Sequence, residues 1–290
     1  MRRYVVLAFV IAIAGGALYY GERTKAEAPV TPAPIMHVIG TAEREATRLP
    51  MGMTRLSDDQ EIEAGNRMAA AYETRLQIAP GSDDEAMEHY VQEVGRKLGA
   101  NAHRRLPYTF HYVPEMGFVN AFALPGGHVF IGKGLIAMMT SEDQLAGVLG
   151  HEIEHIDHYH CAERLQVEAQ AHKIPLGGLA MLPVELFQMG YSKEQELEAD
   201  REGIRLASKV GYSAVASAEL FQRMDQRYRE RQIGAQTPQG EMSRVAFATL
   251  TEYFRSHPAT AERIAQIEHV AADEQLPVMQ ERDLRVTVGP

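Results

Sequence analysis

The stretch GHEIEHIDHYH, residues 150–160, places four histidines and three acidic residues within eleven positions. His151 and His155 are four residues apart, so on a helix both imidazoles leave the same face, about 5–6 Å from each other. Two imidazoles at this spacing can share one tetrahedral metal ion, and Glu152 between them can reach a water molecule on that ion. The alternative is a solvated polar helix face, because a HExxH pattern also arises by chance in a chain rich in His and Glu.

The sequence around this stretch predicts a helix. Ser141 and Gln144 have the spacing of a capping box, which marks a helix start. Apolar residues at helical spacing cover the side opposite the histidines: Leu145, Val148, Leu149, Ile153 and Ile156. We expect this helix to run from Ser141 through the histidines to about Gln170.

A metal site needs ligands beyond the two histidines. The single cysteine, Cys161, excludes a cysteine-based zinc cluster, and a catalytic zinc requires a third protein ligand and an open position. The pattern HExxHxxGxxH is absent, since His158 stands at its glycine and Cys161 at its third histidine. The stretch KEQELEAD, residues 193–200, supplies glutamates instead. Glu196 and Asp200 share a helix face, so one can bind the metal while the other hydrogen-bonds a ligating imidazole.

The composition limits the class of protein. With 45% hydrophobic and 23% charged residues, the 290-residue chain resembles a folded globular protein. Its formal net charge of -10 argues against nucleic acid as a partner, because phosphate binding requires a basic surface. With one cysteine, the chain forms no internal disulfide.

The N-terminal segment differs from the rest of the chain. Residues 4–20 carry no charged side chain and follow Arg2 and Arg3. This apolar run fits either an uncleaved membrane anchor or a signal peptide that is removed, and we expect the anchor. Under both interpretations the arginines stay in the cytoplasm and the rest of the chain lies outside it. Residues 21–56, with four prolines, are predicted to be a linker.

The remaining sequence predicts one mainly helical domain, residues 57–272, with a small sheet and a C-terminal tail, residues 273–290. Helices are expected from Ser57, from Ser82 to Gly99, from Ser141, at about 192–210 and 213–231, and from about Pro258 to Ala272. Strands are expected at 107–113 and in two pieces between Phe118 and Ile131, joined at Pro125-Gly126-Gly127. The apolar segment 173–190, rich in Gly and Pro, predicts a loop with short helical pieces.

The motifs resemble those of the zinc metallopeptidase family that includes BepA-like and HtpX-like enzymes and the CAAX prenyl proteases. HEIEH is followed about forty residues later by ELEAD. Three other stretches agree: NAFALPGGHVFIGKGLI (120–136), SEDQLAGVLGHEIEH (141–155) and SHPATAERI (256–264). The resemblance covers roughly residues 57–270. It implies a zincin-like α+β domain, mainly helical, with a small antiparallel sheet beside the HExxH helix.

The same resemblance implies the metal and its ligands. One Zn²⁺ per chain would be held by His151, His155 and Glu196, with Glu152 as the general base. Asp200 would support the site by hydrogen bonding to a ligand.

The resemblance also implies roles for two more distant segments. His257 corresponds to a histidine that in BepA-like enzymes can fill the fourth zinc position and keep the enzyme latent. Its other role would be to donate a hydrogen bond to the oxyanion, for which Arg263 is a weaker candidate. The strand of Val129, Phe130 and Ile131 would be a sheet edge along which an extended substrate pairs.

These expectations combine into a functional prediction. The chain is expected to be a zinc-dependent endopeptidase of the bacterial cell envelope, on the periplasmic side. Anchoring in the inner membrane through residues 4–20 is favoured over a soluble periplasmic form. Its partners would be extended, unfolded or misassembled envelope proteins. Many BepA-like chains carry helical repeats that bind partners, and because this sequence shows no such array after residue 272, recruitment by repeats is not expected. The alternative is a latent, zinc-bound chaperone or assembly factor with little proteolytic turnover.

Overall fold

The computed structural model of the protein describes residues 56–76, 82–174, 176–234, 257 and 261–286. The predicted N-terminal segment, residues 1–20, and nearly all of the predicted linker, residues 21–56, lie outside these ranges. Within them, no helix combines the length and the apolar character needed to cross a membrane.

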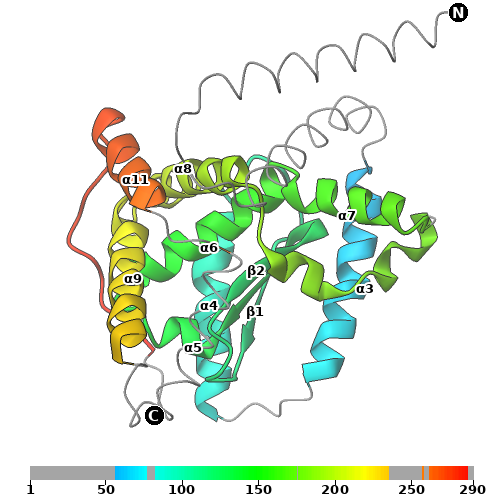
Figure 1. The fold of residues 1–290 in the computed structure, drawn as a ribbon, viewed down its shortest axis with the longest axis horizontal. Helices are drawn as coiled ribbons and strands as arrows, with labels where there is room; N and C mark the ends of the chain where they lie inside the picture. The colour runs from blue at the N-terminus through cyan, green and yellow to red at the C-terminus, as the bar shows by residue number, and fades with distance from the viewer. Residues whose placement is uncertain (1–55, 77–81, 175, 235–256, 258–260, 287–290) are drawn as a thin grey trace, which may run out of the picture. The chain divides into compact units, whose positions relative to one another are not determined.

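The described residues form a mainly helical α+β fold with one small sheet, which confirms the predicted fold class (Figure 1). The helices are α3 (Asp58–Leu76), α4 (Ser82–Gly99), α5 (Lys133–Ile136), α6 (Glu142–Asp157), α7 (His160–Ala171), α8 (Lys193–Lys209), α9 (Ala216–Gly234) and α11 (Ala261–Asp273). The strands are β1 (Thr109–Val113), β2 (Ala121–Leu124) and β3 (His128–Gly132). The short 3₁₀ turns are η1 (Pro125–Gly127), η2 (Leu176–Met181) and η3 (Val184–Met189).

The sheet corrects two sequence-based expectations. Its strand order is β1-β3-β2, with β1 parallel and β2 antiparallel to β3, so the sheet is mixed and not purely antiparallel. Val129, Phe130 and Ile131 therefore lie in the central strand and not at an edge. The η1 turn folds β3 back against β2. Strand β1 pairs along the other side of β3, where Phe110 lies opposite Val129. The edge strand next to the HExxH helix is β2.

The η1 turn is fixed by a buried acid on α3. Gly126 has a φ of 79°, and a Cβ there would lie 2.7 Å from the backbone oxygen of Glu61, so glycine is required. The Glu61 carboxylate accepts a hydrogen bond of 3.2 Å from the Gly126 N–H. It also accepts from the Arg104 guanidinium, at 2.6 Å from Nη2. This clamp holds the β2–β3 hairpin against α3.

The predicted helix from Ser141 to Gln170 is broken in the structure. Its start is as predicted, because the Ser141 hydroxyl accepts from the Gln144 N–H at 3.1 Å. The helix ends at Asp157, and Tyr159 adopts a left-handed conformation with a φ of 64° before α7 begins. Arg104 explains the break, since its guanidinium donates to the Ile156 carbonyl at 2.8 Å and lies 3.9 Å from the Tyr159 ring centre. These contacts come from a distant loop, which local sequence patterns do not report.

Helix α6 lies at the centre of the described fold and packs against α4, α8, α9 and β2 (Figure 1). Its closest approach is to α8, where Gly150 faces Gly203. A Cβ on Gly203 would lie 2.9 Å from the His151 backbone nitrogen, and one on Gly150 would lie 3.0 Å from the Gly203 oxygen. Two glycines therefore let the two backbones touch, and this contact sets the distance between the histidines of α6 and the acids of α8.

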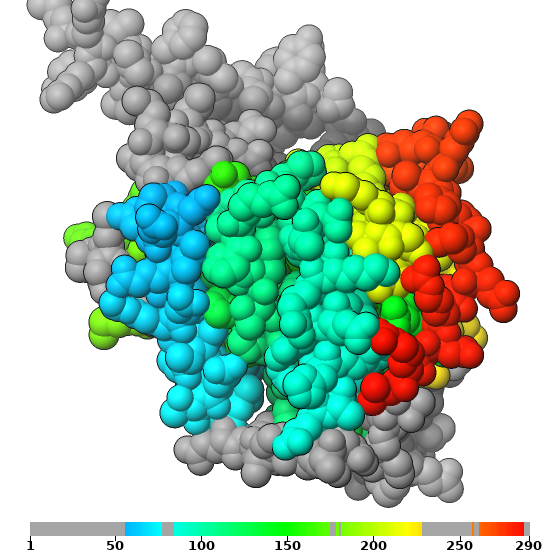
Figure 2. Space-filling model, turned by 180° about the vertical axis from the view of Figure 1, so that it is seen from behind, coloured from blue at the N-terminus to red at the C-terminus, as the bar shows by residue number. Residues whose placement is uncertain are grey.

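The residues after α11, predicted as a tail, pack onto the domain as far as Val286. Ser141 and Asp283 form a β-bridge at the start of α6, and the Arg282 N–H donates to the Asp143 carboxylate at 2.9 Å. Arg285 reaches α4 through an ion pair of 3.0 Å with Glu93. Figure 2 shows these C-terminal residues, in red, against the cyan surface of α4. The start of the metal helix is thus held by the end of the chain.

We expect Gly203→Ala to destabilise the protein by about 1–3 kcal/mol and to weaken metal binding, because the new methyl group meets backbone atoms of α6 that cannot move away. Urea unfolding and a zinc titration would measure both effects. The control is Gly117→Ala, whose Cβ would meet only the Glu115 carboxylate at 3.6 Å. Equal urea midpoints for the two variants would contradict the argument.

Candidate metal centre

Four buried side chains from three parts of the chain converge on one point. The Nε2 atoms of His151 and His155, on one face of α6, are 3.1 Å apart. Each lies 3.5 Å from an oxygen of the Glu196 carboxylate on α8. The fourth member is His257, whose Nδ1 lies 3.1 Å from Glu196 Oε2. One donor atom from each of the four residues falls within a group no more than 4.8 Å across.

The donor set fits a divalent metal ion. All four residues are at most 4% exposed, and Glu196 Oε1 has no hydrogen-bond partner among the described residues. An ionised carboxylate left in this state would cost free energy, and a cation at the point of convergence would remove that cost. Two imidazoles and a carboxylate are the ligands of many catalytic zinc sites. The residues that the sequence analysis proposed as ligands are thus brought together by the fold.

Glu152, next to His151 on α6, lies beside this group and faces His257. It is 1% exposed, its Oε1 lies 3.5 Å from His257 Nε2, and its Oε2 has no hydrogen-bond partner in the described structure. Burial raises the pKa of its carboxyl group above the usual range. A carboxylate that holds a proton more readily than usual is suited to accept one from water near neutral pH.

The acids of α8 are held by an arginine from α11. Arg263 donates two hydrogen bonds of 2.6 Å to Asp200 and lies 2.9 Å from Glu196, and it is 3% exposed. Asp200 in turn lies 3.0 Å from Nδ1 of His151. Asp200 therefore lies within hydrogen-bonding distance of a proposed ligand, the arrangement that the sequence analysis expected. Arg263 is committed to these two carboxylates, so we assign it to holding the ligand set and not to the oxyanion.

The electrostatics of the group follow from this pairing. Burial alone would raise the pKa of Asp200, but Arg263 and His151 reverse that effect and leave it below its ordinary value. The pKa of Glu196 is held well below its usual range, because His257 and Arg263 outweigh burial. Burial lowers the pKa of His151, yet Asp200 and Glu196 raise it to about 9. Both acids are thus ionised at neutral pH.

The second imidazole of α6 has its own support. His155 Nδ1 lies 3.0 Å from Nδ1 of His160, and His160 Nε2 lies 3.2 Å from the Glu198 carboxylate. Because the left-handed residue Tyr159 turns the chain, His160 can point back toward His155. A hydrogen-bonded partner on the far nitrogen fixes the orientation of a ligating imidazole.

An aromatic side chain that the sequence analysis did not single out completes this support. The Tyr191 ring stacks on His155 at 4.0 Å between centres and 18° between planes. Arg164 lies 4.4 Å from the same ring centre and donates to the Leu186 carbonyl at 2.6 Å. Tyr191 comes directly after the apolar segment 173–190, so only the tertiary structure shows that this segment reaches the site.

Comparison with known proteins agrees with the geometry. The model of peptidase family M48 matches residues 84–271. The chain is 31% identical over 196 residues to a putative beta-barrel assembly-enhancing protease of Vibrio cholerae, covering 60% of this chain and 40% of that protein. It is 32% identical over 160 residues to the mitochondrial metalloendopeptidase OMA1 of Schizosaccharomyces pombe, covering 51% and 42%. Against the metalloprotease LoiP of Escherichia coli the identity is 26% over 234 residues, covering 75% and 83%. The chain thus spans less than half the length of the first two relatives.

We expect Arg263→Ala to weaken metal binding about 10–100-fold and to destabilise the protein by about 3–5 kcal/mol, because it leaves buried carboxylates without their cation. Arg205→Ala is the matched control, since Arg205 also joins α8 to the end of α11, through Glu274, but at the surface. The control should cost less than about 1 kcal/mol. Zinc competition titrations and urea unfolding measure both quantities, and equal losses in the two variants would refute the assignment.

Proposed function

The chain belongs to peptidase family M48, and from that membership we propose that it is a zinc-dependent endopeptidase that acts outside the cytoplasm. The observation that carries the proposal is the buried group of His151, His155 and Glu196 with the Glu152 carboxylate beside it. This combination supplies three metal ligands and a general base within one water-poor site.

The chemistry divides between the metal and the protein. A zinc ion held by His151, His155 and Glu196 would supply Lewis acidity, which lowers the pKa of water toward neutrality and polarises a carbonyl. Glu152 accepts the proton of the attacking water and passes it to the leaving amine. Arg263 and Asp200 keep the ligand set in place. His160 and Tyr191 fix the orientation of the His155 ring.

His257 decides whether this site is open. It is 1% exposed, and it lies between Glu196 and Glu152, at 3.1 Å from the first and 3.5 Å from the second. As the fourth member of the donor group, it would fill the position on a bound metal that a substrate or water needs. This position supports a second candidate function, in which the described conformation is a latent state and the protein acts as a zinc-bound chaperone or assembly factor with little turnover.

An extended peptide would bind along β2. In the described part of the chain β2 has a strand neighbour on one side only, and it packs against α6 and η3. All four β2 residues are buried, and the Ala123 carbonyl lies 3.7 Å from the Cys161 sulfur. Main-chain pairing with an open edge is a common mode of peptide recognition. Substrate entry would therefore require η3 to move away from β2.

The natural substrates and the location of the protein are proposed by analogy. Relatives named beta-barrel assembly-enhancing proteases suggest unfolded or misassembled envelope proteins as substrates. The apolar residues 4–20 support an inner-membrane anchor with the metal centre on the periplasmic side. The acidic net charge of -10 supports protein substrates over nucleic acid.

We expect Glu152→Gln to lower the rate of casein cleavage by about 10²–10⁴-fold, because the amide cannot accept the proton of the attacking water. Zinc content should stay unchanged, since Glu152 is not a ligand. Glu168→Gln on α7 is the control and should cleave as wild type does. Undiminished cleavage by Glu152→Gln, measured on the full chain in detergent, would disprove the mechanism.

The same assay with His257→Ala separates the two candidate functions. If His257 keeps the enzyme latent, its removal should raise cleavage above the wild-type rate. If it donates to the oxyanion, removal should lower the rate about 10²–10³-fold. Zinc-loaded protein that is silent as wild type and as His257→Ala, against several unfolded substrates, would favour the chaperone.

A further inference from the structure

A second group of metal-binding side chains lies at the C-terminal end of α6, on a different face from His151 and His155. Glu154 and Asp157 are three residues apart on the helix, and His103 comes from the loop between α4 and β1. One donor atom of each residue lies within a group no more than 4.8 Å across. His103 Nδ1 is 3.2 Å from Asp157 Oδ2. The mechanism proposed above uses none of these three side chains.

The Glu154 carboxylate is buried without adequate hydrogen bonding. The residue is 2% exposed, and its Oε2 has no hydrogen-bond partner in the described structure. The same oxygen lies 3.3 Å from Nε2 of the His158 imidazole, an ion-pair distance without the geometry of a hydrogen bond. A buried carboxylate oxygen in this state loses its hydration without full compensation. A cation at the point where His103 and Asp157 converge would restore that interaction.

Asp157 is already oriented for such a role. Its carboxylate accepts hydrogen bonds of 2.7 and 2.6 Å from the backbone N–H groups of His103 and Arg104. These bonds fix the carboxylate and bring the His103 ring beside it. Asp157 also sits at a helix C-terminus, where the peptide dipoles favour a positive charge and disfavour an acid.

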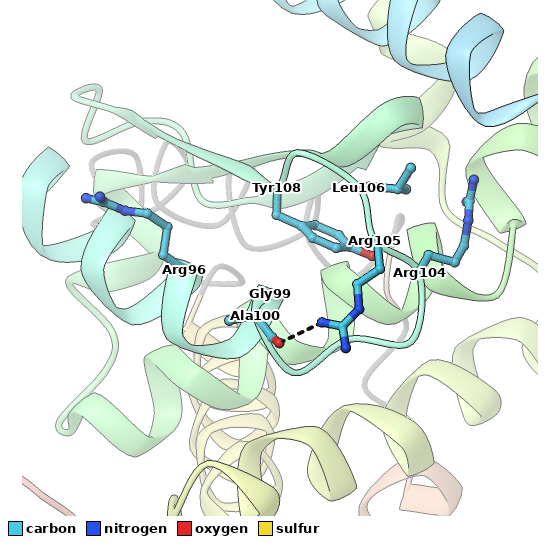
Figure 3. A pocket seen from close by; sticks show the side chains of 7 residues that line it. All are labelled: Arg96, Gly99, Ala100, Arg104, Arg105, Leu106 and Tyr108. Atoms are coloured by element: carbon cyan, nitrogen blue, oxygen red, sulfur yellow. Dashed lines mark hydrogen bonds between the residues drawn. The ribbon is translucent and has the colours of Figure 1, made fainter.

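In the described structure no arginine side chain forms an ion pair with Glu154 or Asp157, although Asp157 also accepts a hydrogen bond of 3.3 Å from the Tyr108 hydroxyl. The Arg104 guanidinium is buried against Glu61 and Asp58 of α3, at 2.6 Å from each. Arg96, in the last turn of α4, and Arg105, on the loop after it, line a pocket of about 290 Å³, and Figure 3 shows Arg104 pointing away from both of them. The charged groups that remain near Glu154 are His158 and Glu202, of which the second adds negative charge. The balance at this end of α6 is therefore acidic.

We infer that His103, Glu154 and Asp157 form a second divalent-cation site, separate from the metal centre of α6 and α8. One imidazole and two carboxylates suit a first-row ion such as Zn²⁺ or Mn²⁺, with water completing its coordination. The His103 side chain is 82% exposed, so the ion can enter from solvent. Bound there, it would tie the α4–β1 loop to the end of the metal helix and offset the buried charge of Glu154.

The test is the zinc stoichiometry of the full chain in detergent, after removal of metal and titration with Zn²⁺ alone. Wild type should bind two equivalents. His103→Ala should bind the second equivalent at least about tenfold more weakly, since a direct ligand is lost. His151→Ala should lose the first equivalent and keep the second. This readout does not depend on proteolysis, so failure of the proposed enzyme and failure of this site are distinguishable.

Two further variants make the test specific. His172→Ala is the control, because His172 is another exposed histidine beside an acid, with its Nε2 3.7 Å from the Glu168 carboxylate. This variant should still bind both equivalents of zinc. Glu154→Gln should lose the second equivalent, and His103→Ala serves if that variant fails to fold, because His103 is at the surface. The inference is overturned if wild type binds one equivalent, or if His103→Ala binds zinc as wild type does. It is also overturned if His172→Ala loses as much binding as His103→Ala.

Discussion

The close crossing of α6 and α8 is the contact on which the rest of the structure depends. Gly150 and Gly203 carry no side chain, so the two backbones can touch. A Cβ placed on either glycine would lie about 3 Å from backbone atoms of the opposite helix. At that separation the Glu196 carboxylate, on the first turns of α8, reaches both imidazoles of α6 at once. A bulkier residue at the crossing would move the carboxylate outward and leave two histidines without a third ligand.

The crossing also concentrates charge, which the surrounding elements must balance. Glu152, Glu196 and Asp200 are all buried, and in water-poor surroundings like charges repel strongly. The α11 guanidinium of Arg263 offsets two of these acids, and the imidazoles and the expected metal offset the remainder. His257 and α11 are therefore part of the metal centre, although His257 and Arg263 follow Glu196 and Asp200 by some sixty residues in the chain.

A break in the metal helix connects this centre to two other parts of the molecule. Arg104 caps α6 at Ile156 and packs on Tyr159, and the resulting turn aims His160 at His155. On the opposite side, Arg164 holds the segment before α8 so that Tyr191 lies flat on the same imidazole. The orientation of one ligand thus depends on a loop after α4 and on the segment that covers β2. Movement of either segment would change the orientation of the His155 imidazole.

The sequence by itself determined the features that follow from local spacing. The four-residue interval of His151 and His155, the helix start at Ser141 and the two short strands joined at Pro125-Gly126-Gly127 each specify a local conformation, and the structure has all of them. Family motifs added Glu196 and Asp200 on one helix face. Tertiary structure decided what depends on contacts between distant segments. Four features are of this kind: the strand order with β3 in the centre, the end of α6 at Asp157, the pairing of Arg263 with two acids and the stacking of Tyr191 on His155. No periodicity records them, because each is set by which surfaces the fold brings together.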